Sequence, residues 1–143
     1  MNKILNIQSK DLFDIVDLTD EVKSFVKESK IEDGLINIQT LHTTATIVVQ
    51  EKEPLLMQDI KEMLLRLIPK DKEYNHDDFD RRTVNMCDDE CRNGHSHCKA
   101  LFLPTSVTLN IIGKKLQLGA WQRILFIELD RARPRKIQMN IIS

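Results

Sequence analysis

Residues 35–50 read Leu35-Ile-Asn-Ile-Gln-Thr-Leu-His-Thr-Thr-Ala-Thr-Ile-Val-Val-Gln50, and β-branched side chains, which favour strands, occur along the whole run. At ~3.3 Å per residue the run is too long for one ordinary strand. It therefore predicts two strands that meet near His42, Thr43 and Thr44. A junction between strands can turn a side chain out of the sheet and into a site, so His42 is the first candidate functional residue.

Two amphipathic helices are expected, one before this run and one after it. The first extends from Thr19 to Lys30, with Thr19 as its N-cap. The second begins at Glu53-Pro54, because proline suits the first position of a helix. Pro69 ends it.

The remaining strands are expected within residues 3–18 and 101–142, with Gly113-Lys114 as a hairpin turn. The count is about seven strands, and most of them are joined as meanders rather than through helices. This pattern predicts an α+β fold and not a doubly wound parallel sheet.

Length and composition limit the possible classes of protein. A chain of 143 residues is most economically a single domain, residues 1–143. A net charge of −1 gives no reason to expect nucleic-acid binding. Three cysteines do not make a disulfide framework. We find no signal peptide and no apolar run long enough to span a membrane, so we expect a cytosolic protein without a membrane partner.

Residues 70–98 differ in composition from the rest of the chain, with few aliphatic and many acidic side chains. Long loops of this kind are usually functional or disordered. Three of the four histidines, His76, His95 and His97, lie here. This concentration of potential ligands argues against disorder and makes the segment the main candidate for a site.

His95-Ser-His97 places two imidazoles on the same side of the backbone if the segment is extended. With His76 and His42 they would form an open, catalytic type of zinc site, in which three imidazoles and a water surround the metal. Imidazole also suits iron, copper and nickel, so the metal is left open, with zinc first. Acidic neighbours are expected to orient the imidazoles: Glu51, Asp77 and Asp78.

The cysteines and the hydroxyl side chains offer two further interpretations. Cys87-x3-Cys91-x3-His95, with Cys98, has the content of a structural zinc site, although its spacing is not the usual C-x2-C. Nucleophilic catalysis by Cys98 is disfavoured, because adjacent residues of an extended chain point apart. An anion site is the other interpretation, with Lys99 and His97 on one face. Its hydroxyl groups come from Thr43, Thr44, Ser96, Thr105 and Ser106.

Several motifs together resemble the YjbQ family, described as secondary thiamine-phosphate synthases. The resemblance covers the chain from about residue 35 to the C-terminus. The motifs are His42-Thr-Thr-Ala-Thr, Gln50-Glu51, Tyr74-Asn-His76-Asp, Asn93-Gly-His-Ser-His-Cys-Lys99, Ser106-Val-Thr-Leu, Gly119-Ala-Trp121-Gln122-Arg123-Ile, Glu128-Leu-Asp and Arg135-Lys136.

The resemblance implies a seven-stranded β-sandwich flanked by two helices, assembled as a homotrimer. It also implies a polar pocket in which His42, His76 and His97 bind a metal or a phosphate-type ligand, with Lys99 nearby. The implied reaction joins a pyrimidine pyrophosphate to a thiazole phosphate and releases pyrophosphate. The chain departs from the common pattern at Leu103-Pro104-Thr105 and in an Asp- and Cys-rich insert around Cys87–Cys91.

The sequence therefore predicts a metal-assisted enzyme that acts on a phosphorylated small molecule, with thiamine-phosphate synthesis as the named candidate. The rival hypothesis is a trimeric metal- or ligand-binding protein that catalyses nothing. The predicted catalytic residues are Glu51, His97 and Lys99. The predicted cofactor-binding residues are Thr43, Thr44 and Ser106. The predicted ligands of a divalent metal are His42, His76, His95 and His97.

Overall fold

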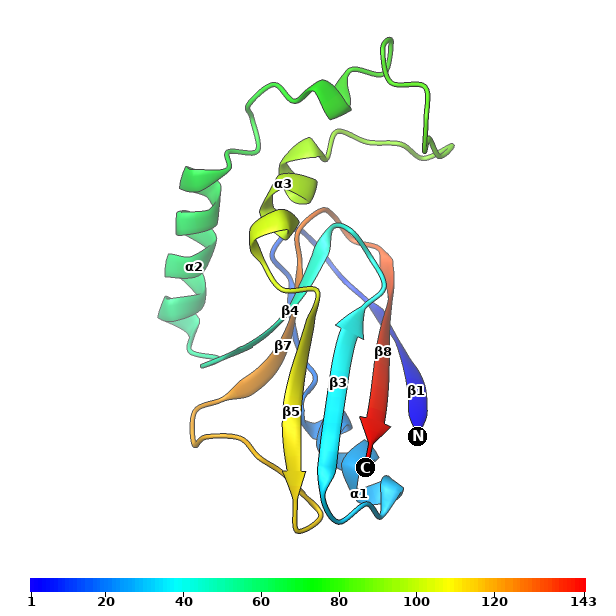
Figure 1. The fold of residues 1–143 in the computed structure, drawn as a ribbon. Coiled ribbons are helices and arrows are strands. Elements are labelled where there is room, and N and C mark those ends of the chain that lie inside the picture. Colours follow the sequence, from blue (N-terminus) through cyan, green and yellow to red (C-terminus); the bar gives the residue numbers. More distant parts are fainter.

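The computed structural model describes residues 1–143 as eight strands, three α-helices and one short 3₁₀-helix (Figure 1). The strands are β1 (Asn2–Gln8), β2 (Ile15–Asp17), β3 (Gly34–Thr40), β4 (Ala45–Gln50), β5 (Ser106–Ile112), β6 (Lys115–Leu116), β7 (Arg123–Glu128) and β8 (Pro134–Ile142). The helices are α1 (Thr19–Ser29), α2 (Pro54–Leu67), the 3₁₀-helix η1 (Asn75–Asp77) and α3 (Gly94–Phe102).

The strands form two antiparallel sheets. The larger sheet has the order β1-β8-β3-β5-β6, and the smaller has the order β2-β7-β4. One of the connections by which the chain passes between the sheets is the β3–β4 connection, residues 41–44. The predicted split of residues 35–50 into two strands near His42 is therefore confirmed, and the two strands enter different sheets.

Alternating side chains build the core between the sheets. In β3, Ile36 and Ile38 are wholly buried, whereas Leu35 on the other face is exposed. In β8, every second residue from Arg135 to Ile141 is buried. Phe25 of α1 belongs to the same apolar cluster. The period of two is that of strands with one face turned to the core.

Helix α2 begins as expected and lies to the side of the sheets (Figure 1). Pro54 occupies its first turn, and the Glu53 carboxylate accepts hydrogen bonds from the backbone N–H groups of Leu55 and Leu56, at 2.9 and 2.8 Å. Only Leu64 of this helix is buried. The helix therefore leaves much of its apolar side uncovered.

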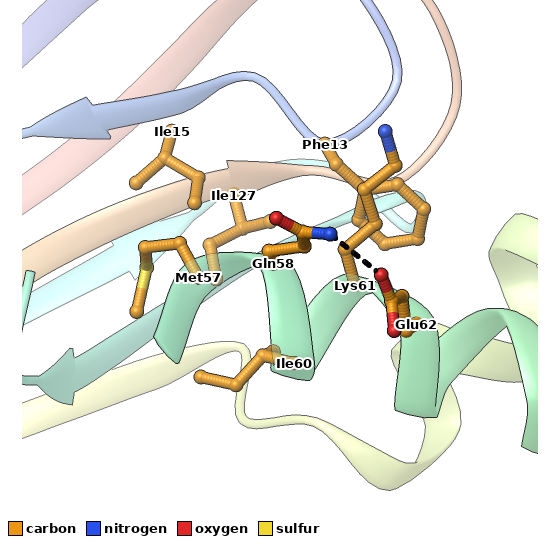
Figure 2. Close-up of a pocket in the computed structure, with 8 residues that line it drawn as sticks. All are labelled: Phe13, Ile15, Met57, Gln58, Ile60, Lys61, Glu62 and Ile127. Carbon is orange, nitrogen blue, oxygen red and sulfur yellow. Dashed lines mark hydrogen bonds between the residues drawn. The ribbon is translucent and has the colours of Figure 1, made fainter. Parts of the chain in front are cut away.

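A shallow groove of about 390 Å³ separates α2 from the smaller sheet. Figure 2 shows its lining, with Met57 and Gln58 of α2 on one wall and Ile15 of β2 and Ile127 of β7 on the other. The groove has mainly apolar walls and lies apart from the histidines. It contains none of the predicted site residues.

The structure corrects the expected element count. The seven-stranded sandwich with two helices is instead a fold of five plus three strands with three α-helices. Residues 94–102 form α3, although an extended segment and the start of a strand were expected there. The hairpin at Gly113-Lys114 is confirmed, with φ values of 55° and 63° that suit a turn of this kind.

None of the helices combines the length and the apolar character that crossing a membrane requires.

Candidate functional site

A buried ion pair lies where β7 ends and β8 begins. The guanidinium of Arg135 donates two hydrogen bonds to the carboxylate of Glu128, the Nε–Oε2 bond measuring 2.7 Å. Ser9 Oγ donates to the same carboxylate at 2.6 Å, and the backbone N–H of Asp130 does so at 3.0 Å. Glu128 is wholly buried, so these four donors replace the water that its charge would otherwise need.

Asp130 connects this ion pair to the segment that precedes α3. Its carboxylate accepts hydrogen bonds from Asn93 Nδ2 and from Arg133 NH1, both at 3.1 Å. Cys91 Sγ donates to it at 3.7 Å. Burial, with the Asp130 charge, raises the pKa of the Cys91 thiol. Cys91 is therefore held as a thiol at pH 7 and not as a thiolate.

Asp77 joins η1 to the start of α3. Its Oδ1 accepts hydrogen bonds from the backbone N–H groups of Asn93 and Gly94, at 2.9 and 2.8 Å. These N–H groups lack partners within the helix, and a carboxylate at this end also complements the helix dipole. Gly94 permits the approach, because a Cβ there would lie 2.5 Å from Tyr74 Cβ.

The hydrogen bonds between Asp77 and the start of α3 bring two histidines into contact. His76 of η1 and His97 of α3 have ring centroids 4.5 Å apart, in an edge-to-face arrangement. Burial is the main cause of a lowered pKa at His97, and the neighbouring His76 lowers it further. His97 is therefore neutral at pH 7. The Nε2 atom of His76 is buried without any hydrogen-bond partner.

Arg82 lies in the same region and was missed by the sequence reasoning. Its NH2 group donates to the backbone carbonyl of Asn85 at 2.6 Å and to Glu90 Oε2 at 3.2 Å. Its charge also contributes to the lowered pKa of His97. The only available signal was an arginine eight residues before a glutamate in a loop that is otherwise acidic.

His95 and His97 do not lie on the same side of the backbone, contrary to the prediction. In a helix, residues two apart project roughly 200° apart, whereas residues four apart share a face. His95 therefore pairs with Lys99, whose Nζ donates to His95 Nδ1 at 2.9 Å. The predicted shared face of His97 and Lys99 is wrong for the same reason.

The His95–Lys99 pair is buried on one face of α3. Burial and the Lys99 charge lower the pKa of His95 to about 4, and burial lowers the pKa of Lys99 to about 8. Lys99 is wholly buried and takes part in no ion pair. Neighbouring Ser96 donates its hydroxyl to the backbone carbonyl of Leu129, which fixes this face of the helix on the sheet.

His42 lies at the β3–β4 junction, as predicted, but its imidazole is already engaged. Its Nε2 accepts a hydrogen bond from the backbone N–H of Lys136 at 2.8 Å. Burial and the charge of Arg135 lower its pKa. Nowhere in the chain are three His, Cys, Asp or Glu side chains close enough together to hold a metal ion. Metal binding by His42, His76, His95 and His97 stays a prediction.

The remaining predicted residues have separate surroundings. Thr44 is buried, and its Oγ1 accepts a hydrogen bond from Arg135 NH2 at 3.0 Å. Thr43 is exposed, and Ser106 is half-buried at the start of β5. Glu51 is exposed just beyond β4 and forms no ion pair. Their predicted roles stay predictions.

The cysteines do not form a common cluster with His95. All three are free thiols, with Cys87 and Cys98 exposed. Cys91 contacts Asp130, whereas His95 contacts Lys99. The arrangement gives no support to the structural zinc site considered for Cys87, Cys91 and His95.

The whole length of the chain can be compared with known proteins. Residues 3–143 match a family model described as UPF0047 protein YjbQ-like. The chain belongs to the YjbQ-like UPF0047 family. A UPF0047 protein of Archaeoglobus fulgidus is 37% identical over 133 residues, which cover 93% of this chain and 94% of that one. The UPF0047 protein YugU of Bacillus subtilis is 30% identical over the full length of both chains.

Solved structures of family members share the fold. A YbjQ-like protein of unknown function from Sulfolobus solfataricus superimposes with a TM-score of 0.87 at 30% identity, covering 99% of this chain and 95% of that one. An uncharacterised YjbQ/UPF0047 protein from Clostridium acetobutylicum gives a TM-score of 0.84 at 31% identity, covering 98% and 99%. The resemblance found in the motifs is thereby confirmed at the level of the family.

We expect Gly94→Ala to lower the free energy of unfolding by about 1–3 kcal/mol, because its new methyl group overlaps Tyr74. Urea denaturation measures this loss. Gly119→Ala is the matched control, since a Cβ there meets only the flexible Gln122 side chain at 3.4 Å. Equal stability of the two variants would contradict the close approach of η1 to α3.

The low pKa of His95 predicts a stability that depends on pH. Between the usual value of 6.5 and the folded value of about 4, the unfolded chain binds more protons than the folded chain, so acid favours unfolding. We expect the wild type to lose about 1–2 kcal/mol more than His95→Gln between pH 7 and pH 5. Urea denaturation at both pH values tests this, and parallel losses would contradict it.

Proposed function

We propose that the protein is an enzyme that acts on a phosphorylated small molecule at the contact between His76 and His97. The observation that carries this proposal is the buried Nε2 of His76, which has no partner although it adjoins a second imidazole. Buried polar atoms in folded proteins are nearly always paired, and a catalytic role or a bound ion is among the reasons for an unpaired one. A polar ligand at this position would supply the missing partner.

The proposal includes a divalent metal ion, with zinc as the leading candidate. The residues present supply some of the ligands that such an ion needs. His76 and His97 provide two adjacent imidazoles, and a neutral His97 is in the form that binds metal. A third protein ligand is missing within one chain. A substrate oxygen or a side chain from another subunit would have to complete the set. When bound, the ion would supply positive charge to a phosphorylated substrate.

The named candidate reaction is thiamine-phosphate synthesis, in which a pyrimidine pyrophosphate and a thiazole phosphate are joined and pyrophosphate departs. The departing group carries negative charge, so the site must provide donors and cations around it. His97 is the residue that we place against the reacting groups. Lys99 lies on the other face of α3, so it contacts the substrate only if the substrate reaches the side that faces the sheet. Glu51 remains the third proposed catalytic residue.

A cytosolic homotrimer is the proposed form of the protein. Several large apolar side chains are left in contact with water on α2, on α3 and before β7. Examples are Leu55, Leu67, Leu101, Phe102 and Trp121. Apolar side chains mark an associating surface where they form one contiguous patch, so the trimer predicts that these side chains are covered at its interfaces.

A non-catalytic trimeric protein that binds a metal or another ligand is the second candidate. It is favoured by the separation of the predicted catalytic residues, because Glu51, His97 and Lys99 share no contact. Such a protein would need only the His76–His97 contact. Turnover distinguishes the two candidates.

The proposal predicts that the purified protein converts the two thiamine precursors to thiamine phosphate, and that His97→Ala or removal of metal with a chelator lowers the rate at least ~100-fold. Chromatography of the product and metal analysis of the protein are the measurements. Cys98→Ser is the matched control, because Cys98 is the exposed neighbour of His97. Equal turnover in the wild type, the His97 variant and the chelated sample would reject the metal enzyme. Bound metal without any turnover would favour the second candidate.

A further inference from the structure

The loop between α2 and α3 contains two further buried polar atoms without partners, one on Arg82 and one on Asn93. The NH1 group of Arg82 is buried and forms no hydrogen bond, like Nε2 of His76. Leaving a buried polar group unpaired costs free energy, and the cost is larger when the group is charged. The charges of Arg82 and His76 both contribute to the lowered pKa of His97, so both side chains lie near it. One ligand beside His97 can therefore meet both unpaired atoms.

The rest of the Arg82 side chain is held firmly. Its NH2 group bonds to the Asn85 carbonyl and to Glu90, and only 12% of the side chain is exposed. Glu90 is itself fixed, because its Oε2 accepts a hydrogen bond from the backbone N–H of Cys87 at 3.2 Å. Asn85 adopts a left-handed φ of 53°, which turns the chain at the carbonyl that Arg82 uses. The guanidinium is thus oriented in advance, with NH2 engaged and NH1 unpaired.

We propose that Arg82 is a binding residue for the substrate, and that its NH1 group donates a hydrogen bond to an oxygen of a phosphoryl or pyrophosphoryl group held beside the His76–His97 contact. This inference rests on the function proposed above and names the residue that gives the site its preference for phosphate.

The chemistry of the free atoms favours an anion with several oxygens. A guanidinium has only donors, so it repels a cation and can be satisfied only by an acceptor. The NH2 group is taken up by Glu90 and the Asn85 carbonyl, and both forks that a guanidinium offers to a carboxylate need this nitrogen, so NH1 is left to bind an oxygen singly. A phosphoryl group has three oxygens and can accept from NH1 and from an imidazole at once.

The test is titration calorimetry of the full chain with pyrophosphate at pH 7. Arg82→Gln should weaken binding about 10- to 100-fold, because a charge-assisted hydrogen bond is lost. Arg82→Lys should give an intermediate affinity. The matched control is Arg81→Gln, since the Arg81 side chain is 72% exposed and lies 3.7 Å from Asp78. That control should bind within about twofold of the wild type.

Glu90→Gln separates binding from a purely structural role. It removes the ion pair that holds the loop but keeps the free NH1 group, so its loss of affinity should be much smaller than that of Arg82→Gln. Equal losses in the two variants would show that Arg82 acts only on the loop and would overturn the inference. Succinate as the titrant should bind far more weakly than pyrophosphate, and equal affinity would overturn the assignment of a phosphoryl ligand.

The calorimetric titrations distinguish a failure of this inference from a failure of the proposed function. If the wild type binds pyrophosphate and Arg82→Gln binds it equally well, Arg82 is not a binding residue, while the proposed function stands. If the wild type, with or without added zinc, binds no pyrophosphate, the proposed function and this inference both fail.

Discussion

The buried ion pair between Glu128 and Arg135 is the interaction on which the rest of the structure depends. Glu128 lies at the end of the smaller sheet and Arg135 near the start of the last strand of the larger one. Ser9, from the β1–β2 connection, and Thr44, from the β3–β4 connection, bond to the same two side chains. An ion pair without water is stable only when further hydrogen bonds satisfy both partners, and here they do. The pair thereby fixes three chain connections relative to both sheets.

The candidate site follows from this anchor step by step. The Glu128 carboxylate holds the backbone of Asp130, and the Asp130 side chain holds Asn93 at the start of α3. Asp77 then binds the same end of the helix and carries His76 onto His97. Segment 68–93, which has few apolar side chains, arches over α3 at the end of the molecule opposite α1 (Figure 1). Its order comes from polar contacts to buried charges and not from an apolar core.

Much of the fold could be predicted because its signals are local. Residues 35–50 are rich in β-branched side chains, and Glu53-Pro54 contains both a cap and a helix start. Helix α3 could not be predicted, because its N-terminal N–H groups are satisfied by Asp77, which lies 16 residues before Asn93. Without that partner, His95-Ser-His97 fits a strand as well as a helix. The period of two of a strand places Lys99 beside His97, whereas in the helix it contacts His95. The contact of His76 with His97 agrees with the clustering of histidines, but its geometry depends on that same distant carboxylate.

The most direct test of this account is the free energy of unfolding of Arg135→Met, measured by urea denaturation beside Lys136→Met, a change at the exposed neighbouring position. The account predicts a loss of about 3–5 kcal/mol for Arg135→Met, because the Glu128 charge is left buried without its partner. Glu128→Leu combined with Arg135→Met should recover much of that loss, since no unpaired charge remains. A loss for Arg135→Met no larger than that for Lys136→Met would contradict the claim that this ion pair holds the site on the two sheets.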